Sequence, residues 1–308
     1  MIIVFGTLEI DVYIPAEKLP ELGQHIRCDD YDSFPGGKGA NQAFSASRAG
    51  SKTAIIGRIG DDAFGRRSTQ NLKRESILGS GIGMVDRPTG CSYMLPGIGE
   101  DMTIISCEGA NMETTSEQVP NEILNASNTV VAQLLIPVEQ TIDLFRRAKD
   151  RGARTVLNAS PPQYANRDIL ELTDLLFLNA REIRILMDHL KMNSNGDIPE
   201  LTQTLSREFK LDCVTTCGSK GSYACYDGQG WHVDAYPVDK VIDPTGAGDC
   251  FLGYLVSLLD QKYRFDEAFH CASIAGSLAC RAQGAQSSVP FLDDVLERAH
   301  DFAAPQRK

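Results

Sequence analysis

A glycine-rich turn followed by an apolar run carries the clearest chemical pattern in this chain. Gly246, Ala247 and Gly248 are small, so a backbone loop built from them can approach a ligand closely. The apolar run at 250–259 has the pattern of a helix. A helix N-terminus offers unpaired N–H groups and the positive end of a dipole, and both attract anions. Asp249 falls in the first turn, where its carboxylate can face the bound anion.

This combination suits the transfer of a phosphoryl group to a hydroxyl. The N–H groups would take the charge that develops on the phosphoryl oxygens, and the carboxylate of Asp249 would take the proton of the hydroxyl. From these residues alone, an ordinary turn with Asp249 as a charge partner of the helix end is an equally good interpretation. The rest of the chain decides between the two.

Three further motifs precede this one. Pro-Gly-Gly-Lys-Gly-Ala-Asn-Gln lies at 35–42, with Ile-Gly-Asp-Asp-Ala-Phe-Gly after it at 59–65. Asn-Ala-Arg-Glu follows at 179–182 and Thr-Cys-Gly-Ser-Lys-Gly at 216–221, before Asp-Pro-Thr-Gly-Ala-Gly-Asp-Cys-Phe at 243–251. In this order and spacing the motifs resemble those of the ribokinase-like (PfkB) family of sugar and nucleoside kinases, most closely its ribokinase branch. One glycine motif is weak evidence, but four in order are strong, and the resemblance runs from position 4 to position 290.

The resemblance implies a catalytic role for the glycine-rich turn. It makes Asp249 the general base that removes the proton from the attacking hydroxyl. The backbone N–H groups of Gly246, Ala247 and Gly248 would form an anion hole around the transferring phosphoryl group.

The resemblance places the sugar-binding residues near the N-terminus. Asp11, Lys38 and Asn41 supply the acceptors and donors that adjacent hydroxyls need, while Gly36 and Gly37 permit close approach of the backbone. A tight turn before a helix is the alternative interpretation of the two glycines. A solvated surface position is the alternative for Lys38.

Two departures from the ribokinase pattern bear on the substrate. Glu9, an expected substrate-binding residue, stands where ribokinases usually have Asn, and Leu135 stands where they carry Glu. A site that lacks a hydroxyl acceptor disfavours a bare hydroxyl at that point and accepts apolar contact. Free D-ribose is therefore not the expected best substrate, although Asn-Ala-Ser-Pro at 158–161 still resembles the ribokinase branch.

Asn179 and Glu182 are three residues apart, so they share a face at the start of the expected helix. The resemblance implies that this pair orders the magnesium–phosphate end of ATP, partly through water. Without the resemblance, Asn followed three residues later by Glu indicates a helix N-cap.

The turn at 216–221 resembles the family's nucleotide-binding edge. Thr216, Gly218 and Gly221 would border the phosphates and ribose of ATP, with Lys220 as a further candidate. A simple hairpin turn is the alternative.

A monovalent-cation site is also implied by the resemblance. Its ligands would be Asp243, Thr245, the Ser288 side chain and the carbonyls around Ala279 and Gly284. Such oxygen ligands suit K⁺, which would stiffen the anion-hole loop, although members of the family differ in their dependence on the cation.

Composition narrows the class of protein. The chain has 308 residues and 42% hydrophobic content, enough for one large α/β domain. A net charge of −11 without a basic run argues against nucleic acid or an anionic membrane as partner. No apolar run approaches the ~20 residues of a membrane span, and a strand pattern starts at position 2 without a basic leader, so we expect a soluble cytoplasmic protein.

The nine cysteines do not form a pattern typical of a disulfide framework. Their number is odd, and most lie in apolar runs, so we expect buried thiols in a reducing compartment. Cys213, Cys217 and Cys225 match no common zinc spacing.

Strand-like and helix-like runs alternate along the chain. This alternation predicts a doubly wound α/β fold, with a mostly parallel sheet flanked by helices and ligands at the carboxyl ends of the strands. The expected strands lie at 2–5, 53–59, 129–135, 155–158, 175–178 and 213–216, with helices such as 137–151 and 180–189 between them.

Two segments interrupt the alternation. Positions 10–34 and 85–107 have the pattern of short β segments separated by turns, without a helix between them. The resemblance implies that they pair into a small β-sheet lid over the sugar site. We expect a single domain over 1–308 that carries this lid, and a homodimer formed through the lid is one assembly that the resemblance allows.

The motifs together predict an ATP-dependent, Mg²⁺-requiring kinase that phosphorylates a primary hydroxyl of a sugar or sugar-like substrate. A nucleoside kinase is the closest alternative, because Leu135 could accommodate a base where ribose presents a hydroxyl. A non-catalytic regulator that binds a sugar or nucleotide is the alternative from another class. The intact motifs around Asp249 and Asn179 argue against that regulator, as does the lack of an appended DNA-binding segment.

Overall fold

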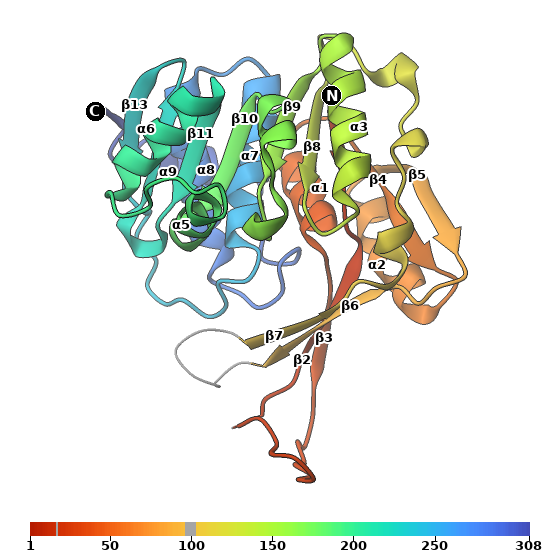
Figure 1. Ribbon diagram of the computed structural model, residues 1–308. Coiled ribbons are helices and arrows are strands. Elements are labelled where there is room, and N and C mark those ends of the chain that lie inside the picture. Colours follow the sequence, from red (N-terminus) through yellow and green to blue (C-terminus); the bar gives the residue numbers. More distant parts are fainter. Residues whose placement is uncertain (17, 96–102) are drawn as a thin grey trace.

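The chain forms a large sheet covered by helices and a separate small sheet (Figure 1). The computed structural model describes residues 1–16, 18–95 and 103–308. The strands of the large sheet are β1 (Ile2–Phe5), β4 (Thr53–Gly60), β5 (Leu78–Val85), β8 (Thr129–Gln133), β9 (Arg154–Asn158), β10 (Leu175–Asn179), β11 (Asp212–Thr216), β12 (Ser222–Tyr226), β13 (Gln229–Val233) and β14 (Gln306–Arg307). The helices are α1 (Lys38–Arg48), α2 (Ala63–Arg74), α3 (Val138–Asp150), α4 (Arg167–Glu171), α5 (Ala180–His189), α6 (Ile198–Phe209), α7 (Ala247–Asp260), α8 (Phe265–Ala279) and α9 (Leu292–Ala299).

The large sheet is mostly parallel, as expected. Its strand order is β14-β13-β12-β11-β10-β9-β8-β1-β4-β5 within the described residues. All neighbours from β11 to β5 pair in parallel, and β12, β13 and β14 add an antiparallel edge.

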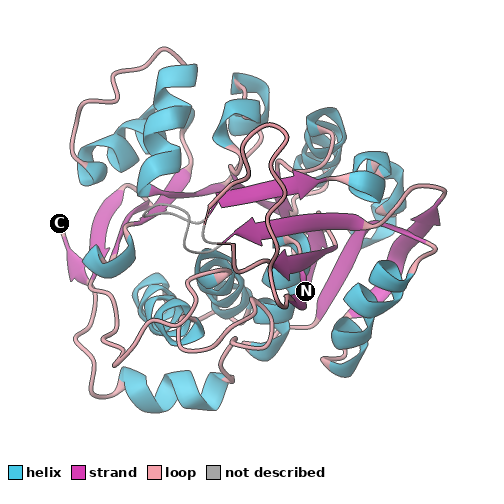
Figure 2. Cartoon of the chain, turned by 90° about the horizontal axis from the view of Figure 1, so that it is seen from below, coloured by secondary structure: helices cyan, strands magenta, loops and turns pink. Residues whose placement is uncertain are grey.

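Alternating residues of the central strands face two separate cores. In β1, Ile2 and Val4 belong to one core, and Ile3 and Phe5 belong to the other, because successive side chains of a strand point to opposite faces. Helices α1, α2, α7, α8 and α9 contribute buried residues to the first core, and α3, α4, α5 and α6 contribute to the second. Helices therefore cover both faces of the sheet, as Figure 2 shows.

Most of the expected strands are confirmed, with three differences. The strand expected at 129–135 ends at Gln133, because its pairing with β9 stops there, although the apolar run continues to Ile136. Strand β5 was not predicted, since its sequence Leu-Gly-Ser-Gly-Ile-Gly-Met-Val is glycine-rich and its residues are exposed or half-buried. The antiparallel strands β12, β13 and β14 were not predicted either.

The small sheet joins the two segments that interrupt the alternation. Its strands are β2 (Glu9–Tyr13), β3 (Asp32–Gly36), β6 (Gly90–Leu95) and β7 (Thr103–Cys107), in the order β3-β2-β6-β7. The predicted pairing of the two insertions is confirmed, because β2 pairs with β6 in parallel. The first insertion has a strand only at each end, and positions 96–102 of the second lie outside the described residues. Figure 1 shows that these lid strands project from one end of the main body.

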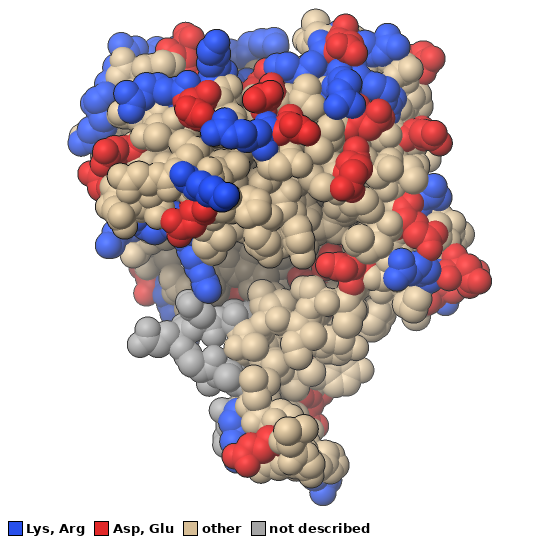
Figure 3. Space-filling view, in the orientation of Figure 1, with Lys and Arg blue, Asp and Glu red and all other residues tan. Residues whose placement is uncertain are grey.

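The surface carries charges of both signs. In Figure 3, Lys and Arg side chains are interspersed with Asp and Glu over the upper part of the face shown, whereas the surface around the lid strands is largely uncharged. Among the described residues, no helix is both long enough and apolar enough to cross a membrane.

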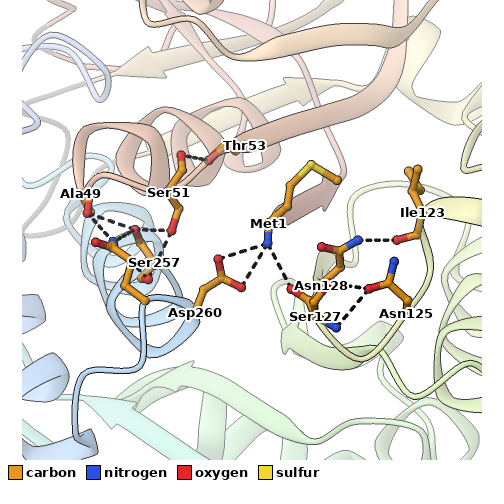
Figure 4. Close-up of polar contacts among 11 residues, drawn as sticks. Met1, Ala49, Ser51, Thr53, Ile123, Asn125, Ser127, Asn128, Ser257 and Asp260 are labelled. Carbon is orange, nitrogen blue, oxygen red and sulfur yellow. Dashed lines mark hydrogen bonds and ion pairs between the residues drawn. The ribbon is translucent and has the colours of Figure 1, made fainter.

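Helix α7 is held against its neighbours along its length. A side chain at Gly253 would collide with Ser45 of α1, so the two helices touch backbone to backbone. At the far end of α7, the hydroxyl of Ser257 donates to the Ala49 carbonyl and Asp260 pairs with the α-amino group of Met1 at 3.1 Å (Figure 4). These contacts fix the position of the helix whose first turn carries Asp249.

Candidate active site

The first turns of α1 and α7 meet at Asp249. Its carboxylate is buried, and the side-chain amides of two α1 residues donate to it: Gln42 Nε2 to Oδ1 at 2.8 Å and Asn41 Nδ2 to Oδ2 at 3.2 Å. The structure therefore brings together the two glycine motifs that lie some 200 residues apart in the sequence. Two hydrogen bonds hold this buried carboxylate in one orientation, and each of its oxygens can accept a further hydrogen bond.

The glycine-rich turn before Asp249 has the geometry of a helix N-terminus. Gly246 is the N-cap of α7 in the left-handed region at φ 78°, and a Cβ there would come within 2.5 Å of Ala285 Cβ. The Ala247 N–H donates to the Pro244 carbonyl at 3.1 Å and closes the turn. Ala247 and Gly248 are the first residues of α7, so the backbone presents the helix N-terminus at this point.

Asp11 lies on lid strand β2 next to the Pro35–Gln42 motif. A side chain at Gly36 would collide with the Asp11 carboxyl group, so Gly36 makes room for it. Burial raises the pKa of Asp11 to about 8, and the nearby carboxylates of Glu9, Asp249 and Asp243 add to that rise. At neutral pH the Asp11 carboxyl group therefore retains its proton and can both donate and accept a hydrogen bond.

Glu9 is held at the start of the same strand by two polar side chains. Ser92 Oγ donates to Oε2 at 3.0 Å, and Asn111 Nδ2 donates to Oε1 at 3.2 Å. Burial raises the pKa of Glu9 above its ordinary value, although the hydrogen bond from Ser92 opposes the rise. The side chain is buried, two positions along β2 from Asp11.

Lys38 begins α1 among carboxylates. Burial lowers its pKa, but the charges of Asp249, Glu182 and Glu9, together with Asp11, outweigh burial and leave the pKa raised. Lys38 is half-buried, and its positive charge is the counterpart of an otherwise acidic site. Gly37, just before it, is the N-cap of α1 at φ 89°, and Gly39 lies so close to β1 that a Cβ would come within 2.7 Å of the Gly6 backbone.

Asn179 and Glu182 form a capping box. The Asn179 side chain accepts from the N–H groups of Arg181 and Glu182, and the Glu182 carboxylate accepts from the Asn179 N–H at 2.8 Å. The pair thus caps α5, as the sequence without the resemblance indicates. Both side chains lie at the end of β10 and are at least partly exposed, so they also remain accessible to a ligand.

The turn at 216–221 and the start of α7 share one pocket. Its volume is about 640 Å³, and it is lined by Thr216, Gly218 and Gly221 on one side and by Ala247 and Gly248 on the other. Much of its remaining lining is apolar: Tyr236, Pro237, Val238, Val241 and Phe251. Lys220 is exposed and does not line the pocket. An apolar pocket that opens on a helix N-terminus suits a ligand with a flat ring at one end and phosphates at the other.

The loop before α7 contains the buried carboxylate of Asp243, which accepts three hydrogen bonds. The buried Asp243 carboxylate accepts from Tyr13 Oη at 2.9 Å, from the Thr245 N–H at 2.9 Å and from the Gly284 N–H at 3.2 Å. Ser288 Oγ is buried and has no partner among the described residues. An oxygen that lacks a hydrogen-bond partner is one that a cation could use, so the residues fit the expected ligand set.

The structure adds site residues that the sequence did not reveal. Leu135, which the sequence indicates as a residue that affects substrate choice, lies half-buried just after the end of β8. Gln42, Gln133, Asn111 and Tyr13 were not assigned a role. Gln42 stands inside the quoted motif beside Asn41, and that position was the only signal for it.

Comparison with known proteins identifies the family. The profile of the pfkB family carbohydrate kinases matches residues 1–292. Ribokinase of Staphylococcus aureus is 32% identical over 300 residues, which covers 96% of this chain and 98% of that protein. The bifunctional ribokinase/ribose-5-phosphate isomerase A of Fructilactobacillus sanfranciscensis is also 32% identical over 96% of this chain, which spans 55% of that longer protein.

Solved structures agree with this result. A ribokinase from Thermotoga maritima superposes with a TM-score of 0.87 at 26% identity, covering 97% of this chain and 99% of that one. A ribokinase of Arabidopsis thaliana complexed with ribose and ATP has a TM-score of 0.86 at 26% identity, covering 97% and 98%. The predicted ribokinase-like fold with its lid is confirmed, and the chain belongs to the pfkB family of carbohydrate kinases.

Proposed function

We propose that this protein transfers the γ-phosphoryl group of ATP to a primary hydroxyl of a sugar or sugar-like substrate, with Asp249 as general base. The observation that carries the proposal is the position of Asp249. Its buried carboxylate lies at the helix N-terminus that lines the 640 Å³ pocket, and the carboxyl groups of the lid residues Asp11 and Glu9 lie close enough to interact with the same site. A phosphoryl donor on one side and a hydroxyl acceptor on the other would meet at this carboxylate.

In the proposed step, Asp249 takes the proton of the substrate hydroxyl while the hydroxyl oxygen bonds to the γ-phosphorus. The bond between the γ-phosphorus and the oxygen that bridges to ADP breaks, and ADP leaves with that oxygen. The N–H groups of Gly246 and Gly248 would stabilise the charge on the transferring group, and the Ala247 N–H would join them only if it left the Pro244 carbonyl.

The substrate would bind between β2 and the start of α1. Protonated Asp11 can donate to one hydroxyl and accept from another, and the Lys38 ammonium can donate to a third. The backbone at Gly36 and Gly37 has no side chain to block its approach. Asn41 and Glu9 complete this group, although the amide of Asn41 is already engaged with Asp249.

ATP would occupy the apolar pocket with its phosphates at the N-terminus of α7. Thr216, Gly218 and Gly221 line the pocket and would border the ribose and phosphates. The Asn179–Glu182 pair would order the Mg²⁺–phosphate end through water, and the ion would neutralise charge on the phosphoryl oxygens. The Arabidopsis ribokinase complexed with ribose and ATP, and a Cryptococcus neoformans ribokinase in complex with ADP, support ATP as the nucleotide.

A monovalent cation, K⁺ in our proposal, would be held beside the anion hole by Asp243, Thr245 and Ser288, with carbonyls near Ala279 and Gly284. Ser288 Oγ is buried without a hydrogen-bond partner in the described part of the chain, and this supports the assignment. The cation would supply positive charge and rigidity to the loop that leads into the first turn of α7.

A nucleoside kinase is the second candidate. Leu135 places a half-buried apolar side chain where the resemblance predicts a hydroxyl acceptor, and such a group can contact a base. An ATP-consumption screen over pentoses, hexoses, ketoses and nucleosides separates the two candidates.

The remaining assignments concern the whole molecule. We propose one domain over 1–308, a cytoplasmic location and small-molecule substrates without nucleic acid. A homodimer through the lid would cover Ile104 and Ile105, which are 51% and 53% exposed on β7. The molar mass in solution, measured by light scattering for the protein and for an Ile105→Asp variant, tests the dimer.

The Asp249→Asn variant tests the central proposal. The amide has nearly the same shape but cannot take the proton, so kcat should fall by about 10²–10⁴. ATP affinity, measured by calorimetry, should stay within a few-fold of that of the original protein. A variant that keeps more than a tenth of the turnover on the best substrate contradicts the role of Asp249.

A further inference from the structure

Four buried amide side chains form two short chains of hydrogen bonds that end at the Asp249 carboxylate, and we call these chains its two arms. In the first arm, Gln133 Nε2 donates to Gln42 Oε1 at 2.6 Å, and Gln42 Nε2 donates to Asp249 Oδ1 at 2.8 Å. In the second arm, Gln286 Nε2 donates to Asn41 Oδ1 at 3.3 Å, and Asn41 Nδ2 donates to Asp249 Oδ2 at 3.2 Å. Gln133 and Gln286 do not bond Asp249 themselves, and they are 0% and 1% exposed.

The direction of both arms is set by the carboxylate. An ionised carboxylate only accepts hydrogen bonds, so each neighbouring amide must turn its NH₂ group toward Asp249 and its oxygen away. Each of those oxygens then needs a donor, and Gln133 and Gln286 supply their own NH₂ groups. Reversal of one amide would place two oxygens against each other.

The far ends of the arms show a cost of this arrangement. Gln133 Oε1 and Gln286 Oε1 are both buried, and neither has a hydrogen-bond partner among the described residues. A buried polar atom without a partner destabilises the folded protein, and an apolar side chain of similar size would avoid that cost. Gln133 and Gln286 each supply an NH₂ donor to the network, and in each of them the side-chain oxygen is left without a hydrogen-bond partner among the described residues.

We infer that Gln133 is a positioning residue for phosphoryl transfer, which acts on Asp249 through Gln42. Its NH₂ group fixes the orientation of the Gln42 amide, and the Gln42 amide in turn holds Asp249 Oδ1 in place. Each carboxylate oxygen can accept a second hydrogen bond, which leaves room for the substrate hydroxyl. This inference rests on the proposed function, in which Asp249 is the base.

Two substitutions at position 133 separate orientation from packing. Gln133→Leu keeps the approximate volume but removes the donor, and kcat should fall about tenfold, a fraction of the contribution of the base itself. Gln133→Glu keeps the shape but replaces the donor by an acceptor, which favours the reversed Gln42 amide with its oxygen toward Asp249. We expect kcat of Gln133→Glu to be at least about tenfold lower than that of Gln133→Leu. The KM values for sugar and for ATP should change less than about threefold.

Gln118 provides the matched control. It is a half-buried glutamine that likewise donates from Nε2, but its acceptors are the backbone carbonyls of Gly57 and Gly81 and not a residue of the Asp249 network. Gln118→Leu should lower the unfolding midpoint and leave kcat unchanged. The double variant Gln42→Leu/Gln133→Leu should be no slower than Gln42→Leu alone, because Gln133 has no other route to Asp249.

Each outcome has a defined meaning. Normal turnover by Asp249→Asn would remove the proposed base and leave the inference without a target. An inactive Asp249→Asn protein together with normal kcat for Gln133→Leu would overturn the positioning role but leave the function intact. Additive losses in the double variant would also overturn it. If Gln133→Glu does not fold, as judged by ATP binding, the Leu variants alone decide.

Discussion

The hydroxyl of Tyr13, at the end of lid strand β2, donates a 2.9 Å hydrogen bond to the carboxylate of Asp243, in the loop before α7. The two residues are 230 positions apart in the sequence. Burial raises the pKa of Tyr13, and the neighbouring Asp243 charge raises it further, so the phenol remains a donor over the physiological pH range. This hydrogen bond joins the lid to the loop that leads into the anion hole.

Tyr13→Phe removes this hydrogen bond and should lower both the stability of the protein and its apparent affinity for K⁺. A hydrogen bond to a charged group contributes about 1.5–3 kcal/mol, so the free energy of unfolding should fall by about that amount. The concentration of K⁺ that half-activates the enzyme should rise, because Asp243 loses one of the contacts that orient it. Chemical denaturation and kcat as a function of K⁺ concentration measure the two effects. Tyr31→Phe, at an exposed tyrosine before β3, is the control, and equal behaviour of both variants would contradict the link.

Potassium should increase turnover through Ser288. We expect a higher kcat in K⁺ than in tetramethylammonium at equal ionic strength, since the larger cation cannot enter a site formed by Asp243, Thr245 and Ser288. Ser288→Ala should reduce this difference without changing kcat in tetramethylammonium. Identical rates of the unsubstituted protein in both salts would exclude the cation site.

Asp11 should make the protein less stable as the pH rises. Its pKa is about 8 in the folded protein against an ordinary value of 3.8, so between about pH 4 and pH 8 the folded state holds a proton that the unfolded state has lost. Because the folded state binds more protons there, the free energy of unfolding falls with pH, by up to about 1.4 kcal/mol per pH unit from this group. Urea denaturation at several pH values should show a flatter profile for Asp11→Asn. If the free energy of unfolding of Asp11→Asn falls as steeply with pH as that of the original protein, another group causes the pH dependence.

Free D-ribose should be a poor substrate. Leu135 cannot accept a hydrogen bond from a sugar hydroxyl, and an unpaired hydroxyl can cost a few kcal/mol, which changes kcat/KM by orders of magnitude. The measurement is kcat/KM for ribose beside ketoses, modified pentoses and nucleosides. Leu135→Glu should gain activity on ribose, with Leu134→Met, at a fully buried neighbour, as the control. Ribose as the best substrate of the original protein would refute this prediction.

The central fold could be predicted because the buried strands have unmistakable apolar runs. Strand β1 is apolar on both faces, and its expected limits agree with the structure. Strand β5 escaped prediction because its glycines and its exposed edge position remove that pattern. The end of β8 was predicted two residues too late, since Leu134 and Ile136 are buried for reasons other than strand pairing.

Most of the site could be predicted because its residues lie within a motif, and Asp11 and Glu9 were assigned through the family resemblance alone. Thr216, Ala247 and Gly248 belong to recognisable motifs, and the three residues line one pocket. Asn111, which holds Glu9, lies 102 positions away in a segment without a motif. The role of the Asn111 amide cannot be seen in the sequence, because its partner Glu9 comes close only when the chain folds.

The crowding at Gly39 bears on how inactive descendants of this protein could be recognised. Gly39 lies against the Gly6 backbone, and Gly36 makes room for Asp11, so these glycines are required for α1 and β3 to assemble with the strands beside them. A descendant that had lost phosphoryl transfer but kept its shape would retain this part of the signature. The acid function of Asp249 has no part in this close packing, so replacement by a residue of similar shape, such as Asn, would be a visible mark of lost catalysis. Surveys of related sequences should therefore classify members by residue 249 and not by the glycines.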